Sequence, residues 1–146
     1  MTQKRLFIIF FLIGLAITQH LGWLAFTGIR PNLVLVFLVI LTPFLEDFIF
    51  YLVLIILSYL LLKLEPILDW PVLFLMGLLT ISYPLARTLP WQRIFNQSFL
   101  IILVTVIFYF AISFKFVINN PILLIGEVLY NLVLGLILMS LVNNAI

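Results

Sequence analysis

The chain has 146 residues, of which 66% are hydrophobic and 8% are charged, and its formal net charge is +2 at pH 7. Soluble domains carry about 25% charged residues, so this composition excludes a water-soluble globular domain and predicts a membrane protein. The seven Lys and Arg residues occur singly or in pairs, and this scatter excludes the basic track that nucleic-acid binding requires.

The first apolar run extends from Leu6 to Phe26 and follows Lys4 and Arg5. A run of about 21 residues is long enough to cross a hydrocarbon core of about 30 Å. It also exceeds the roughly 7 to 15 residues of a cleaved secretory signal. We therefore expect a retained signal-anchor helix.

Gly14, Thr18 and Gly22 follow one another at four-residue spacing within this first run. Small residues on one helix face allow a second helix to approach closely in lipid. The pattern predicts a helix contact on this face. The second helix is either part of this chain or part of a partner protein.

The next apolar stretch, from Leu33 to Tyr59, is interrupted by Thr42, Pro43, Glu46 and Asp47. Each half contains about 12 to 15 residues, or roughly 18 to 23 Å of helix, which is short for a full crossing. One long broken helix would place two carboxylates in mid-bilayer, each at a cost of several kcal/mol. We therefore favour a hairpin of two short helices with the acidic pair at its tip.

The remaining apolar runs predict three more spans separated by short polar loops. Pro121 is well placed as the first residue of the last helix. The result is an all-α polytopic membrane protein of about six short transmembrane helices in one bundle, formed as a single domain over residues 1–146. The later segments are a loop at 63–70, a span at 72–86, a loop at 87–97, a span at 99–114 and a span at 122–142.

Basic residues give a weak preference for one orientation. The six-span arrangement has four basic residues on the side of the termini and three on the other, so the positive-inside rule favours cytoplasmic termini by one residue. We expect Arg87 and Arg93 to lie at the cytoplasmic face, where they would meet anionic lipid or a cytoplasmic partner. The four are Lys4, Arg5, Arg87 and Arg93, and the three are Arg30, Lys63 and Lys115.

The last helix carries Glu127, Asn131 and Gly135 at four-residue spacing. These residues form a polar and then small stripe that should face away from lipid. We interpret it as a packing face held by hydrogen bonds. A binding site for a partner helix and a substrate or ion site are the alternatives.

The sequence contains few residues or motifs that could support catalysis. The chain has one His and no Cys, and it lacks HExxH, a glycine-rich phosphate loop and a GxSxG elbow. We therefore predict a protein that is not an enzyme and that has no cofactor and no metal site.

Two segments resemble a known bacterial family. The segment GIRPNLVLVFLVIL at residues 28–41 and the segment GEVLYNLVLGLILMSL at residues 126–141 are similar to MreD, a rod shape-determining membrane protein family. The shared features are Pro31 and Asn32 before an aliphatic run, and Asn131 after Glu127 in the last helix. The family usually has a glycine-rich third span that ends in Asp, whereas residues 48–63 of this chain contain no glycine.

The resemblance implies a non-catalytic scaffold in the bacterial cytoplasmic membrane that serves cell elongation and peptidoglycan synthesis. Its implied partners are membrane lipid, the bitopic protein MreC, the actin-like MreB filament and a wall-synthesis glycosyltransferase complex. The family is also similar in architecture to the substrate-binding subunits of energy-coupling-factor vitamin transporters. That alternative predicts a cavity of about 300 Å³ or more, with Ser82, Tyr83, Glu127 and Asn131 as its candidate lining.

Overall fold

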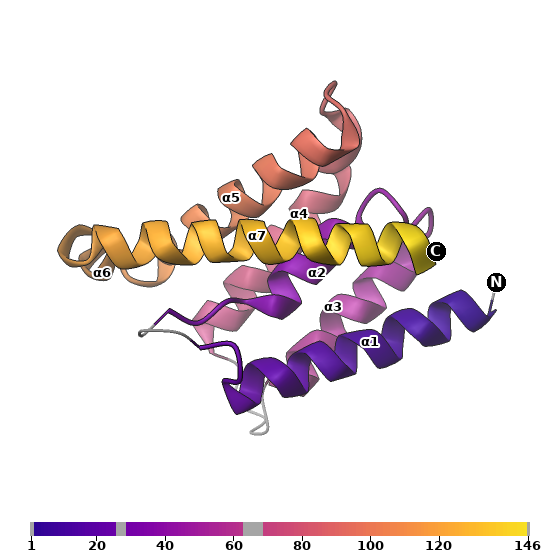
Figure 1. Cartoon of the computed structure of the whole chain (residues 1–146), viewed down its shortest axis with the longest axis horizontal. Coiled ribbons are helices and arrows are strands. Elements are labelled where there is room, and N and C mark those ends of the chain that lie inside the picture. The colour runs from indigo at the N-terminus through magenta and orange to yellow at the C-terminus, as the bar shows by residue number, and fades with distance from the viewer. Residues whose placement is uncertain (1, 26–28, 63–68, 146) are drawn as a thin grey trace.

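The computed structural model describes residues 2–25, 29–62 and 69–145, and within these ranges the chain is helical with no strand (Figure 1). The all-α class is therefore confirmed. Figure 1 shows both termini at the same end of the longest axis. The described helices are α1 (Thr2–Leu21), α2 (Leu33–Leu41), α3 (Phe48–Leu62), α4 (Trp70–Thr88), α5 (Arg93–Ile112), α6 (Phe114–Asn119) and α7 (Pro121–Ala145).

Four of the described helices, α1, α4, α5 and α7, are long and apolar enough to cross a membrane. The helix α3 is apolar but has 15 residues, and α2 has nine, whereas a spanning helix needs about 20. The described residues thus form an all-helical fold with four candidate membrane spans. The expected count of about six is not confirmed.

The short helix α2 forms the centre of the bundle. All nine of its residues, LVLVFLVIL, are buried, and it packs against α1, α3, α4, α5 and α7 (Figure 1). A helix that is hydrophobic on every side has no face suited to water and is stable only when it is surrounded. The helix α2 is therefore the buried central helix of the bundle, and the other helices surround it.

The stretch from Leu33 to Tyr59 forms two helices, the arrangement that the sequence favours over one broken helix. The break covers residues 42–47, where Pro43 has no N–H to continue the helical hydrogen bonds. Instead, the Thr42 hydroxyl donates to the Val39 carbonyl at 2.8 Å.

Two helix boundaries differ from the prediction. The helix α1 ends at Leu21 rather than at Phe26, because Gly22 adopts a φ of 65°, a left-handed conformation that ends a helix readily when the residue is glycine. Phe26 itself lies outside the described residues. The loop expected at 87–97 is confined to residues 89–92, because α4 continues past Arg87 and α5 begins at Arg93.

The structure also refines the spans expected at 99–114 and 122–142 and the loop expected at 63–70. The span expected at 99–114 is divided, because the Ser113 hydroxyl accepts the Phe116 N–H at 3.3 Å and starts the short helix α6. Pro121 begins α7, as predicted. Most of the predicted loop at 63–70 lies outside the described residues.

Candidate functional site

The N-terminus of α2 is buried in the bundle, so its N–H groups need partners other than water. The N–H of Val34 donates to Gln19 Oε1 of α1 at 3.0 Å. The N–H of Leu35 donates to Asn32 Oδ1 at 3.1 Å, which makes Asn32 the N-cap. Side chains from two parts of the chain thus replace the water that this helix end lacks.

Asn131 joins the same site from α7. Its Oδ1 accepts the backbone N–H of Asn32 at 3.0 Å, and its Nδ2 donates to Thr105 Oγ1 in α5 at 3.3 Å. Asn131 is 1% exposed, so both hydrogen bonds form in an environment where unpaired polar groups are costly. We call Gln19, Asn32, Thr105 and Asn131 the amide cluster.

Glu127 lies one turn before Asn131 and is also buried, with 6% of its surface exposed. Its carboxylate faces the Tyr109 hydroxyl and the backbone N–H of Arg30. The Oε2 atom is buried without a hydrogen-bond partner among the described residues. This is the one predicted polar residue of α7 whose hydrogen bonding is incomplete.

Gly135 completes the α7 stripe at a close helix approach. A Cβ atom at this position would lie 2.5 Å from Ile101 Cδ1 of α5 and 3.4 Å from Val36 Cγ1 of α2. Glu127, Asn131 and Gly135 therefore all face the interior of this chain. The structure places the predicted stripe within the bundle, the first of the interpretations drawn from the sequence.

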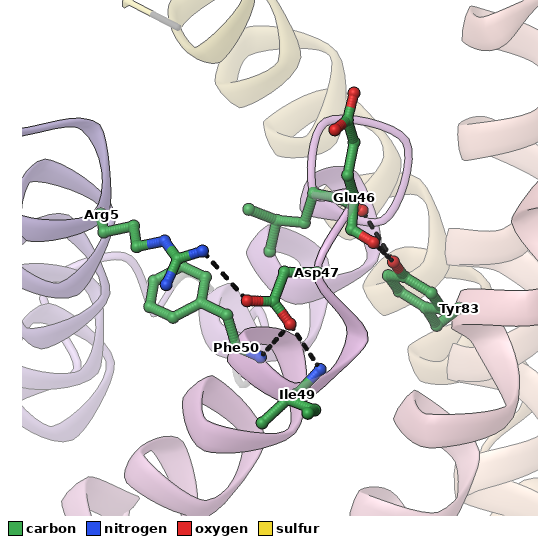
Figure 2. Close-up of polar contacts among 7 residues, drawn as sticks. Arg5, Glu46, Asp47, Ile49, Phe50 and Tyr83 are labelled. Carbon is green, nitrogen blue, oxygen red and sulfur yellow. Dashed lines mark hydrogen bonds and ion pairs between the residues drawn. The ribbon is translucent and has the colours of Figure 1, made fainter. Parts of the chain in front are cut away.

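The opposite end of α2 carries the charges. Arg5 and Asp47 form an ion pair at 3.0 Å, and both side chains are about 40% exposed. Asp47 Oδ1 also accepts the N–H groups of Ile49 at 3.0 Å and Phe50 at 3.2 Å (Figure 2). Asp47 therefore caps the N-terminus of α3 while it pairs with α1.

Tyr83 and Arg87 of α4 hold the other side of this turn. The Tyr83 hydroxyl lies 2.8 Å from the Leu45 carbonyl and 3.0 Å from the Glu46 carbonyl (Figure 2). Arg87 donates to the Leu45 carbonyl at 2.6 Å and to the Tyr83 hydroxyl oxygen. These donors satisfy carbonyls that follow the C-terminus of α2 and have no helical partner.

Each of three arginines at this end stacks on an aromatic ring. The guanidinium carbons of Arg5, Arg87 and Arg93 lie 4.9, 4.4 and 4.7 Å from ring centroids, within the range of cation–π attraction. We call residues 42–47, together with these arginines, the charged turn. The rings belong to Phe50, Tyr83 and Phe44, in the same order.

The α1 ladder is divided, because Gly14 is exposed whereas Thr18 and Gly22 are half-buried and line a small hollow with Arg30 and Pro31. A Cβ atom at Gly14 would meet nothing within 4 Å, and the Thr18 hydroxyl bonds back to the Gly14 carbonyl at 2.9 Å. Gly22 is the left-handed residue that ends the helix. The helix packs instead through a separate row, Ile8, Leu12 and Ala16, which is buried.

Sequence reasoning missed several residues that hold the bundle. Tyr51 donates to the Leu79 carbonyl at 3.2 Å and lies 3.3 Å from Ser82 Oγ, and Gln97 Nε2 donates to Thr42 Oγ1 at 3.4 Å. Thr105 was also missed, as was the contact between Gln19 and the Val34 N–H. A polar residue within an apolar helix is the signal that identifies such positions, but it does not name the partner.

The polar residues proposed for a substrate cavity do not converge. Ser82 contacts the Tyr51 hydroxyl, and Tyr83 contacts the charged turn after the C-terminus of α2. Glu127 and Asn131 lie beside the N-terminus of α2 instead. The hollows beside Trp91, Arg5 and Arg93 open to the surface. No group of three or more metal-ligating His, Cys, Asp or Glu side chains occurs among those residues.

Comparison of the chain with protein-family models, curated proteins and solved structures found no match.

Proposed function

We propose that this chain is a non-catalytic membrane subunit that binds a partner membrane helix, and that it acts in the bacterial cytoplasmic membrane as part of the cell-elongation machinery. The cellular assignment rests on the resemblance of residues 28–41 and 126–141 to the MreD family. The partner is a bitopic MreC-like protein. The complex serves an actin-like filament and a wall-synthesis glycosyltransferase.

The docking proposal is supported by a difference between two helix faces, because one packs inside the chain and the other is exposed. The α7 stripe is used inside the chain, where Asn131 pairs with Asn32 and Thr105. The α1 face at Gly14 has no such use, since Gly14 is exposed and borders open space. A face with a glycine at its middle suits close approach by a helix from another protein.

The exposed residues of α1 also have the spacing of a helix-pairing seam. They alternate at intervals of three and four, the repeat that keeps one face directed at a neighbouring helix. Glycine at the middle position would let the partner backbone come close. The seam consists of Phe7, Phe10, Gly14, Ile17 and Leu21, all of which are exposed.

The test compares two glycines with matched surroundings. Gly14 in α1 and Gly77 in α4 are both exposed, and a Cβ atom at either meets nothing within 4 Å. We expect Gly14→Leu to remove most of the co-expressed MreC-like protein that purifies with the chain. Gly77→Leu should leave recovery unchanged. Equal recovery with both variants would remove the docking proposal.

The cellular part of the proposal has its own measurement. In a rod-shaped host, depletion of this protein should produce rounded cells, and the wild-type gene should restore rods. Complementation by the Gly77→Leu variant but not by Gly14→Leu would link cell shape to the α1 seam. Normal rods after depletion would separate the protein from cell elongation.

A further inference from the structure

A surface groove lies between the first turn of α5 and the last turns of α7. It has a volume of about 480 Å³ and is lined by Arg93, Ile94, Leu136, Met139, Ser140 and Asn143. Each helix contributes an accessible apolar side chain to an apolar wall of the groove, since Ile94 of α5 is 55% and Leu136 of α7 is 47% exposed. Arg93, Ser140 and Asn143 supply its polar groups.

Arg93 differs from the other two arginines of the charged turn in its partners. Arg5 pairs with Asp47, and Arg87 donates to the Leu45 carbonyl. Arg93 lies over the Phe44 ring at 4.7 Å, and no carboxylate of the described residues pairs with it. Its guanidinium therefore keeps N–H donors available for an anionic group.

The position of Arg93 also suits the membrane surface. It is the first residue of α5, a helix long and apolar enough to cross a membrane. Basic residues at the ends of spans lie at the level of lipid headgroups. An anion bound by Arg93 would therefore be at headgroup depth, with the apolar wall of the groove extending into the hydrocarbon region.

We propose that this groove binds an anionic phospholipid, with the headgroup phosphate at the Arg93 guanidinium and an acyl chain along Ile94 and Leu136. A guanidinium donates to a phosphate through two parallel hydrogen bonds. An acidic peptide would match the charge but not the apolar wall, which lies beside lipid. A lipid without net charge would leave the charge of Arg93 uncompensated.

The experiment uses the full chain in a neutral detergent, titrated with phosphatidylglycerol or phosphatidylcholine, and counts retained lipids by native mass spectrometry. We expect Arg93→Gln to lower the preference for phosphatidylglycerol about fivefold, the factor for one basic residue at an anionic surface. Arg93→Lys should keep most of this preference. Lys115→Gln removes an exposed charge elsewhere and should change nothing.

A second variant tests the groove without changing its charge. Leu136→Trp should fill the apolar wall and lower retention of both lipids, because the acyl chain loses its place. Together, the Arg93→Gln and Leu136→Trp results would identify a bound phospholipid that uses both its headgroup and its acyl chain. This inference needs only a membrane protein, so loss of the partner-docking proposal would leave it intact.

Three results would overturn the lipid site. The first is an unchanged lipid preference in Arg93→Gln. The second is an equal loss in Lys115→Gln, which would indicate attraction to total charge. The third is displacement of the lipid by an equal concentration of soluble glycerol phosphate, which would assign the site to a free phosphate.

Discussion

The side-chain oxygen of Asn131 accepts a hydrogen bond from the backbone N–H of Asn32 at 3.0 Å, across 99 residues of sequence. This contact ties the last helix to the cap of the central helix α2. The same amide reaches Thr105 in α5 through its nitrogen. One buried side chain therefore fixes the positions of three helices.

Replacing Asn131 with Leu should destabilise the protein by about 1 to 3 kcal/mol, the cost of leaving buried polar groups without a partner. The Asn32 N–H loses its acceptor in this variant. Ser140→Leu, at an exposed position of the same helix, should change stability by less than about 0.5 kcal/mol. Thermal unfolding in detergent measures both, and equal effects would contradict the role of Asn131.

Asp47 combines a helix cap with an ion pair, and two substitutions separate these roles. Asp47→Ala should cost about 1 kcal/mol through loss of the cap. Asp47→Asn keeps a capping oxygen and should cost much less, because the half-exposed pair with Arg5 is weakened by solvent and salt. Thermal unfolding with and without added salt tests this. An equal loss in both variants would show that the ion pair dominates.

Tyr83→Phe should destabilise the charged turn by about 1 kcal/mol. The lost hydroxyl contacts the Leu45 and Glu46 carbonyls and accepts from Arg87, and one hydrogen bond contributes about this amount. The Tyr130 hydroxyl makes no hydrogen bond within the described part of the chain, so Tyr130→Phe is the control. Denaturant titrations of the two variants should differ, and coinciding curves would refute the assignment.

Gly14 and Gly22 should respond in opposite directions to alanine. Gly14 is inside α1 beside open space, so Gly14→Ala should raise stability by about 0.5 to 1 kcal/mol. Gly22 has a φ of 65°, a conformation that costs alanine roughly 1 kcal/mol or more. Thermal midpoints of the purified variants provide the measurement. A gain at Gly22 would contradict the turn.

Several features of the fold could be predicted because they depend on local sequence. The break between α2 and α3 coincides with the predicted interruption around Pro43 and Asp47, and α7 begins at Pro121. The end of α1 was placed too late, because the hydrophobic run continues past Gly22 whereas the helix ends at Leu21. The expected count of about six spans is not confirmed for a related reason, because α2 is as apolar as a membrane span but has nine residues.

The sequence by itself determined that this protein is helical and suited to a membrane, because hydrophobic length and polar interruptions act residue by residue along the chain. It also identified Asn131 as a buried hydrogen-bonding residue. Only the tertiary structure decided that the Gly14 face is open, that the α7 stripe is closed, and that Arg5, Arg87 and Arg93 converge on one turn. Those outcomes depend on contacts between helices distant in sequence, and the partner of a polar side chain is set by which helices surround it.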